Sequence, residues 1–185
     1  MAVIIGLIIV VIIVVILIAW IIATYNRLIS SREFVRNAMG QISAQIESRW
    51  DALQNMIEGT KQYAEYEAET LESITEQRAS LGKNVAVDEV NKDDQLFNQA
   101  MGRLFAVAES YPDLKASQLY QETMENVNRY EQQVRQSRMI YNDTVTKYNR
   151  IIQSIPSNII ASMFNFTQKD YFENTESKTD MPGWS

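Results

Sequence analysis

The sequence predicts an all-α membrane protein, in which an N-terminal transmembrane helix is followed by an antiparallel bundle of long helices. Two observations lead to this prediction. The first 26 residues carry no charged side chain and consist mostly of Ile and Val. From Arg27 onward, apolar residues recur every three or four positions over long segments, and this spacing is typical of amphipathic helices. Long helices with short breaks between them pack best as an antiparallel bundle.

The chain divides into three parts. Residues 1–24 are predicted to form a transmembrane anchor, residues 25–172 a helical bundle domain, and residues 173–185 a polar C-terminal tail. About 20 helical residues cover the roughly 30 Å hydrocarbon core of a bilayer, and the apolar run is long enough for this. Inside lipid, only a helix satisfies the backbone of such a segment. The membrane interface is expected near the end of the run, at Trp20, Tyr25 and Arg27.

The alternative for this segment is a cleaved signal peptide. A signal peptide has a basic start and an apolar core of about 7–15 residues, whereas here the basic start is missing and the apolar run is longer. Arg27, Arg32 and Arg36 follow the span, and no charged side chain precedes it. The positive-inside rule then predicts that the N-terminus lies outside and the domain in the cytoplasm.

The composition excludes several classes of function. The net charge is −6 and there is no basic run, so nucleic acid is not an expected partner. The chain has no Cys and no His, which excludes a thiolate nucleophile, a Cys/His zinc site and imidazole acid–base catalysis. The Glu-rich stretch 65–76 lacks the spacing of a calcium loop and indicates a solvated helix face. We therefore expect that the protein is not an enzyme and that it binds no metal, no cofactor and no small-molecule substrate.

Three helices are predicted in the bundle domain. The first continues the anchor as one rod from Ala2 to about Ser80, because no strong stop separates the span from Leu28. A loop is expected over residues 80–94, followed by a helix capped by Asp93 or Asp94 and ending near Ser110. The sequence Tyr111-Pro112-Asp113 breaks this helix. The third helix ends before Pro156.

The third helix has the most regular pattern, with two registers of heptad spacing. One register contains Val127, Val134, Tyr141, Tyr148 and Ile155, and the other contains Met124, Glu131, Arg138, Val145 and Ile152. Glu131 and Arg138 interrupt this apolar seam, and Glu67 interrupts that of the first helix. We interpret these three as core polar residues that fix the helix register through buried or half-buried ion pairs. The alternative, a catalytic carboxylate with an activating cation, lacks a third polar group.

A short apolar segment follows Pro156. Ser157 or Asn158 is expected to cap a short helix. Its large apolar side chains must dock on protein or on the bilayer, and they are Ile159, Ile160, Met163, Phe164 and Phe166. An interfacial helix favours basic residues, but Lys169 is the only one between Arg150 and Lys178. Docking on the chain's own bundle or on a neighbouring subunit is therefore preferred.

Several strings of this sequence resemble the LemA family, over essentially the whole chain. They are Tyr25-Asn26-Arg27-Leu28, Gln41-Ile42, Arg49-Trp50-Asp51, Tyr63-Ala64, Arg78-Ala79-Ser80, the stretch from Ala108 to Ala116, Tyr141-Asn142-Asp143, Tyr148-Asn149 and Ile155-Pro156-Ser157-Asn158. The resemblance implies a bacterial membrane protein with a helical bundle and no established catalytic activity, located in the inner membrane. One departure is Gln54, in a segment where the family often has a proline.

Two functions from different classes remain. The first is a non-enzymatic scaffold that self-associates or holds protein partners at the bacterial inner membrane. The second is a component of a membrane signalling or envelope-stress system. The expected partners are the lipid bilayer, further copies of the chain and membrane-associated proteins that the sequence does not identify. The long seams, together with the small residues Ala2 and Gly6 at the start of the span, favour a homo-oligomer.

Overall fold

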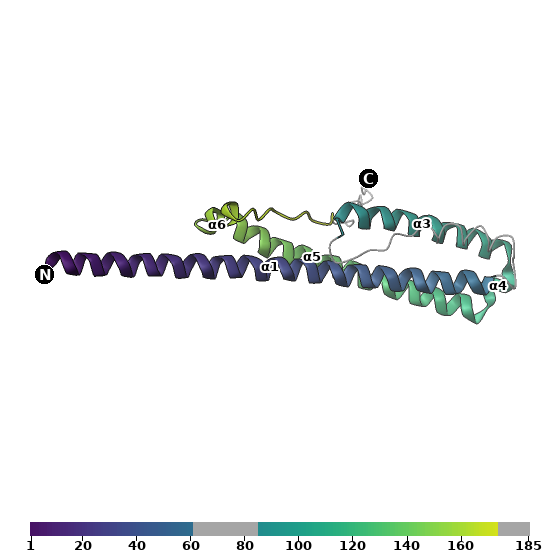
Figure 1. The fold of residues 1–185 in the computed structure, drawn as a ribbon. Helices are drawn as coiled ribbons and strands as arrows, with labels where there is room; N and C mark the ends of the chain where they lie inside the picture. The colour runs from purple at the N-terminus through teal and green to yellow at the C-terminus, as the bar shows by residue number, and fades with distance from the viewer. Residues whose placement is uncertain (61–84, 174–185) are drawn as a thin grey trace, which may run out of the picture.

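The computed structural model describes residues 1–60 and 85–173. Within these residues the chain is helical and contains no strand. The elements are α1 (Ala2–Thr60), α3 (Val87–Ser110), α4 (Pro112–Ala116), α5 (Gln118–Gln153) and α6 (Ser157–Met163), and an extended segment follows α6. Figure 1 shows α5 running back along α1, with α3 beside them at the end of the bundle away from the N-terminus. The predicted all-α fold is confirmed.

Helix α1 is one uninterrupted helix that begins in the apolar run and ends in the bundle. The prediction of a single rod is confirmed over Ala2–Thr60, while its continuation to Ser80 lies outside the described residues. Figure 1 shows the first part of α1 projecting alone beyond the other helices. The most apolar 18-residue stretch has a mean hydropathy of 3.6 and none of it is buried within the protein. By length and composition, α1 is suited to cross a membrane, and it is the one described helix that is.

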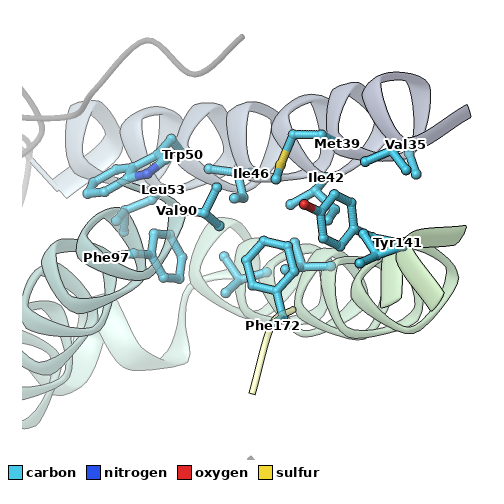
Figure 2. Close-up of a cluster of buried hydrophobic side chains, with 14 of the residues drawn as sticks. Val35, Met39, Ile42, Ile46, Trp50, Leu53, Val90, Phe97, Tyr141 and Phe172 are labelled. Carbon is cyan, nitrogen blue, oxygen red and sulfur yellow. The ribbon is translucent and has the colours of Figure 1, made fainter. Parts of the chain in front are cut away.

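The core forms where α1 and α5 pack against each other in antiparallel directions. The apolar residues that recur every three or four positions along α1 form its buried stripe, which contains Leu28, Val35, Met39, Ile42, Ile46, Trp50, Leu53 and Ile57. On α5 the predicted register is buried at Val127, Val134, Tyr141 and Tyr148. Its last member was wrong: α5 ends at Gln153, and Ile155 lies in the following turn with 84% of its surface exposed. Figure 2 shows side chains of α1 facing those of α3 and α5 across the core.

Helix α3 begins earlier than the sequence predicted. The loop expected over residues 80–94 was wrong for residues 87–94, because the helix starts at Val87 with Ala86 as its N-cap. Packing favours this start, since it adds Val90 to the apolar face formed by Phe97, Ala100 and Leu104. Asp93 is consequently a buried residue inside the helix, not its cap.

The connection between α3 and α5 follows the prediction. Helix α3 ends at Ser110, Tyr111 is not helical, and Pro112 occupies the first turn of α4, where its missing N–H is not needed. Ser117 then caps α5, since its hydroxyl accepts a hydrogen bond of 3.2 Å from the Tyr120 amide. The short helix after Pro156 is also present as α6. Its predicted side-chain cap was wrong, because the Ser157 hydroxyl donates to the Ile151 and Ser154 carbonyls instead.

Two asparagines of α5 hold the extended segment that follows α6. The Asn149 side chain accepts from the Lys169 amide and donates to the Lys169 carbonyl, both at 2.9 Å. Asn142 makes the same pair of bonds with Phe172, both at 2.9 Å. Seven residues of helix rise about 10.5 Å and three residues of extended chain span about 10 Å, so the two repeats match. Each side-chain amide thus pairs with both the N–H and the C=O of one residue of the extended segment, as the backbone of a neighbouring β-strand would.

Replacing Asn149 with Ala removes both hydrogen bonds to Lys169 and leaves its backbone groups without these partners. We expect the free energy of unfolding of the full chain in detergent to fall by about 1–3 kcal/mol. Thermal and denaturant unfolding followed by circular dichroism measure this change. Asn128→Ala, at an exposed position of the same helix, is the matched control. Equal stability of the two variants would show that the hydrogen bonds between Asn149 and Lys169 contribute nothing to the free energy of unfolding.

Candidate functional site: an ion-pair cluster between three helices

A buried arginine of α1 joins the three long helices. Only 2% of the Arg49 side chain is exposed. Its Nη1 donates to Glu131 Oε1 of α5 at 2.6 Å. Its Nη2 donates to Asp94 Oδ1 at 2.9 Å and to Asp93 Oδ2 at 3.4 Å, and both acceptors belong to α3. One guanidinium, with its several donors in a fixed plane, therefore links α1 to both of its neighbours.

The next residue of α1 completes the surroundings of Asp93. The Trp50 indole donates from Nε1 to Asp93 Oδ2 at 2.9 Å. Its ring meets Phe97 edge-on, with 5.1 Å between centroids, and the Arg49 guanidinium lies 4.0 Å from the Phe97 centroid. Figure 2 shows Trp50 and Phe97 facing each other across α1 and α3. The polar and aromatic contacts thus fix the same pair of helices.

The two core polar residues predicted on α5 both belong to this cluster. Glu131 pairs with Arg49, whereas Arg138 pairs with Asp94 and lies 4.9 Å from the Phe172 ring centroid. Both are partly exposed, at 31% and 18% of their side chains. Asp94 bridges the two arginines, so α3 supplies the link between them. Glu67, the third predicted residue, lies outside the described residues.

The cluster combines three carboxyl groups with two guanidinium groups, and not every polar atom is satisfied. Burial raises the pKa of Asp93, while the bond from Trp50 and the charge of Arg49 act in the opposite direction. Asp93 Oδ1, Arg49 Nε and Arg138 Nε are buried without a hydrogen-bond partner among the described residues. Each buried charge therefore depends on the few partners it has, and removal of one partner is costly.

The geometry suits helix positioning better than chemistry. Each carboxyl group accepts from a guanidinium or indole donor, and in residues 1–60 and 85–173 no three His, Cys, Asp or Glu side chains are arranged so that they could hold a metal ion. A groove of about 700 Å³ runs between α1 and α5, but no residue of the cluster lines it. A register-setting role for Glu131 and Arg138 stays a prediction, and their cross-helix pairing favours it.

The predicted interface residues lie at the membrane end of the bundle. Trp20 is exposed, and Arg27 is an exposed residue lining the groove between α1 and α5. Tyr25 is half-buried. Its ring centroid lies 4.7 Å from that of Phe164 and 5.9 Å from that of Phe166. The bundle therefore reaches the end of the predicted span.

The predicted docking segment has two sides. Ile160 and Phe166 lie in the core of the chain itself, at 2% and 8% exposure. Ile159, Met163 and Phe164 remain exposed, although Phe164 contacts Tyr25.

Sequence reasoning missed Arg49, Asp93 and Asp94. A signal for Asp93 was present, because it lies three residues after Val90 and four before Phe97, at a core position of the helix. The expected loop concealed this spacing. Arg49 gave no such signal, since a charge beside Trp50 is ordinary on an amphipathic helix.

Comparisons with known proteins identify two kinds of relative. The chain is 28% identical over 153 residues to Protein LemA of Metamycoplasma hominis, which covers 82% of this chain and 69% of that protein. It is 32% identical over 77 residues to Magnetosome protein MamQ 2 of Paramagnetospirillum magneticum, and 29% over 76 residues to Magnetosome protein MamQ of Magnetospirillum gryphiswaldense. The last two matches cover 42% and 41% of this chain but only 28% of each relative.

The family comparison covers the region that holds the cluster. A model described as the LemA family matches residues 38–183, which include Arg49, Asp93, Glu131 and Arg138. This match spans well over half of the chain and begins within α1, after the apolar run. The chain therefore belongs to the LemA family.

Proposed function

We propose that this protein is a non-enzymatic scaffold, anchored by α1 in the bacterial inner membrane, that holds protein partners or further copies of itself there. One observation supports this most strongly: α1 is both the candidate span and a core helix. Its side chains are exposed up to about Trp20, and from Leu28 onward one stripe of its side chains is buried in the bundle. A partner bound to the bundle is therefore coupled to the bilayer through a continuous helix.

The same helix supports retention of the anchor. Ile21 packs against the core, Thr24 is buried, and the Tyr25 ring contacts that of Phe164 in a tilted arrangement. Cleavage after Ile22 would remove Ile21 from the core and would leave Thr24 and Tyr25 in the first, frayed turn of the shortened helix. The arginines that follow the span favour an outside N-terminus and a cytoplasmic domain.

Two further points favour a scaffold over an enzyme. The cluster around Arg49 joins helices, and each of its carboxyl groups accepts at least one hydrogen bond from a guanidinium or indole donor. The matched relatives are named for the LemA family or for the magnetosome, and none of these names states a reaction.

Self-association would use surfaces outside the heptad seam, because the α1 and α5 seams pack on each other within one chain. The span is one such surface. A Cβ added to Gly6 would meet no atom within 4 Å, so a neighbouring helix can approach there.

Two experiments on the full chain test the proposal. A reporter that works only in the cytoplasm should be active when it is fused after Ser185. Activity only of a reporter that requires export would overturn the predicted orientation.

Extraction in gentle detergent, followed by pull-down and by light scattering corrected for the micelle, should recover further copies of the chain or structural proteins. Recovery of a monomer together with a kinase, protease or receptor would favour the signalling alternative.

Gly6→Leu should reduce self-association through the span while leaving the bundle intact.

A further inference from the structure

One side of α6 and the turn before it expose large apolar side chains. Ile155, Ile159 and Met163 follow one another at every fourth position, with 84%, 59% and 63% of their surfaces exposed. Phe164 adds a ring that is 46% exposed. The opposite side of α6 is buried through Ile160 and Ala161. Such a grouped apolar surface on a folded domain usually marks a contact with another phase or another protein.

The location of this surface indicates what covers it. The Phe164 ring lies against Tyr25, only three residues beyond the last apolar residue of the span, Ile22. Three residues of helix correspond to about 4.5 Å along the axis. Figure 1 shows α6 beside α1 at the end of the bundle from which the apolar part of α1 projects. When α1 crosses a bilayer, α6 therefore lies at the level where hydrocarbon meets the headgroups.

The charge pattern agrees with an interfacial position. Residues 151–168 contain no charged side chain, although they include the exposed turn and all of α6. The scarcity of basic residues in this segment favoured docking on protein when the sequence was considered alone. The fold changes that argument, because other helices supply the missing cations. Arg27 of α1 and Lys147 and Arg150 of α5 line the groove beside this end of the bundle, and its lining includes no carboxylate.

We propose that the apolar surface formed by Ile155 of the turn, Ile159 and Met163 of α6, and Phe164 at its C-cap lies in the surface of the bilayer as a second membrane contact. The cations of the adjoining groove bind anionic lipid headgroups. A rigid span and a surface contact on one side together restrict how the bundle can tilt. This inference rests on the proposed anchoring by α1.

The test uses the full chain in lipid vesicles. The sequence has no Cys, so a single introduced Cys is labelled uniquely with an environment-sensitive fluorophore. Met163→Cys reports on α6. Two matched positions serve as controls, Gln136→Cys on the exposed face of α5 and Val11→Cys in the exposed part of the span. Nitroxide lipids quench labels that are in contact with the bilayer.

The Met163 label should emit at shorter wavelength than the Gln136 label and be quenched by lipids with the nitroxide near the headgroup. The Val11 label should be quenched by lipids with the nitroxide deep in the acyl chain. Water-like emission without lipid quenching at Met163, with quenching retained at Val11, would overturn this inference and leave the anchor standing. Loss of quenching at Val11 as well would instead contradict the proposed anchoring. A third outcome is emission from the Met163 label that shifts when unlabelled chain is added but is not quenched by the lipids. This result would assign the apolar surface to a second copy of the chain and overturn the proposed contact with the bilayer.

The lipid composition tests the role of the groove. Quenching at Met163 should be stronger in vesicles that contain phosphatidylglycerol than in phosphatidylcholine alone. The double variant Lys147→Glu, Arg150→Glu should lose this difference. Equal quenching in both kinds of vesicle would overturn the preference for anionic headgroups.

Discussion

Replacement of Arg49 by Met is expected to lower the free energy of unfolding by about 3–5 kcal/mol. The side chain is 2% exposed and pairs with Glu131, Asp94 and Asp93. Methionine fills much of the same volume but provides no donor and no charge. The variant would then hold three neighbouring carboxyl groups with Arg138 as the remaining cation of the cluster. Unfolding of the full chain in detergent, followed by circular dichroism, measures the change.

The pH dependence distinguishes this cause from a simple loss of packing. Burial already raises the pKa of Asp93 above its ordinary 3.8, and Arg49 opposes that shift. Without Arg49 the pKa of Asp93 rises further, so the folded variant binds more protons than the folded unmodified protein and its stability rises more steeply as the pH falls. The deficit relative to the unmodified protein should therefore be smaller at about pH 5 than at about pH 8. A deficit that does not change with pH, or one no larger than that of the exposed control Arg135→Met, would contradict the ion-pair account.

Trp50→Ala is expected to cost about 3–5 kcal/mol, because it opens a cavity where α1 meets α3. Trp50 is 1% exposed and packs on Phe97. The substitution also removes the indole donor from Asp93. Trp50→Phe keeps most of the apolar volume and removes only the donor, so it should cost about 1–3 kcal/mol. Phe34→Ala, at a position of α1 that is 62% exposed, is the control for loss of an aromatic ring. A Trp50→Ala variant as stable as this control would show that the contact is not part of the core.

The features that could be predicted from the sequence are those that depend on local spacing. The candidate span follows from the length and composition of one segment, and the seam of α5 follows from a repeat of seven. The uninterrupted passage from span to bundle follows from the absence of a helix stop before Leu28. Each of these signals is contained in a single helix.

The features that could not be predicted depend on contacts between helices. Glu131 and Arg138 stood out in the seam, but their partners Arg49 and Asp94 come from two other helices. The helix was predicted to start at Asp93 or Asp94, which made Asp93 a candidate N-cap, whereas α3 starts at Val87 and Asp93 is buried within it. The same limit applies to Asn142 and Asn149, since their bonds to Phe172 and Lys169 require an extended segment of matching repeat to lie alongside.

The side of α6 that faces the bundle also could not be predicted from the sequence. Ile159 and Ile160 are neighbours of the same chemistry, yet Ile160 is buried and Ile159 is exposed. Their difference arises from the direction in which the turn at Pro156 places α6 against α1.

The central claim is that one rigid helix carries the chain from the bilayer into the bundle. Its most direct test is the distance between two spin labels on α1, placed at Val14→Cys and Ala44→Cys in the full chain in lipid nanodiscs. Both positions are exposed, and no other Cys competes for the label. Thirty residues of continuous helix predict a narrow distribution centred at about 45 Å between the backbone positions. A broad distribution centred well below that value would show a break between span and bundle and would contradict the account.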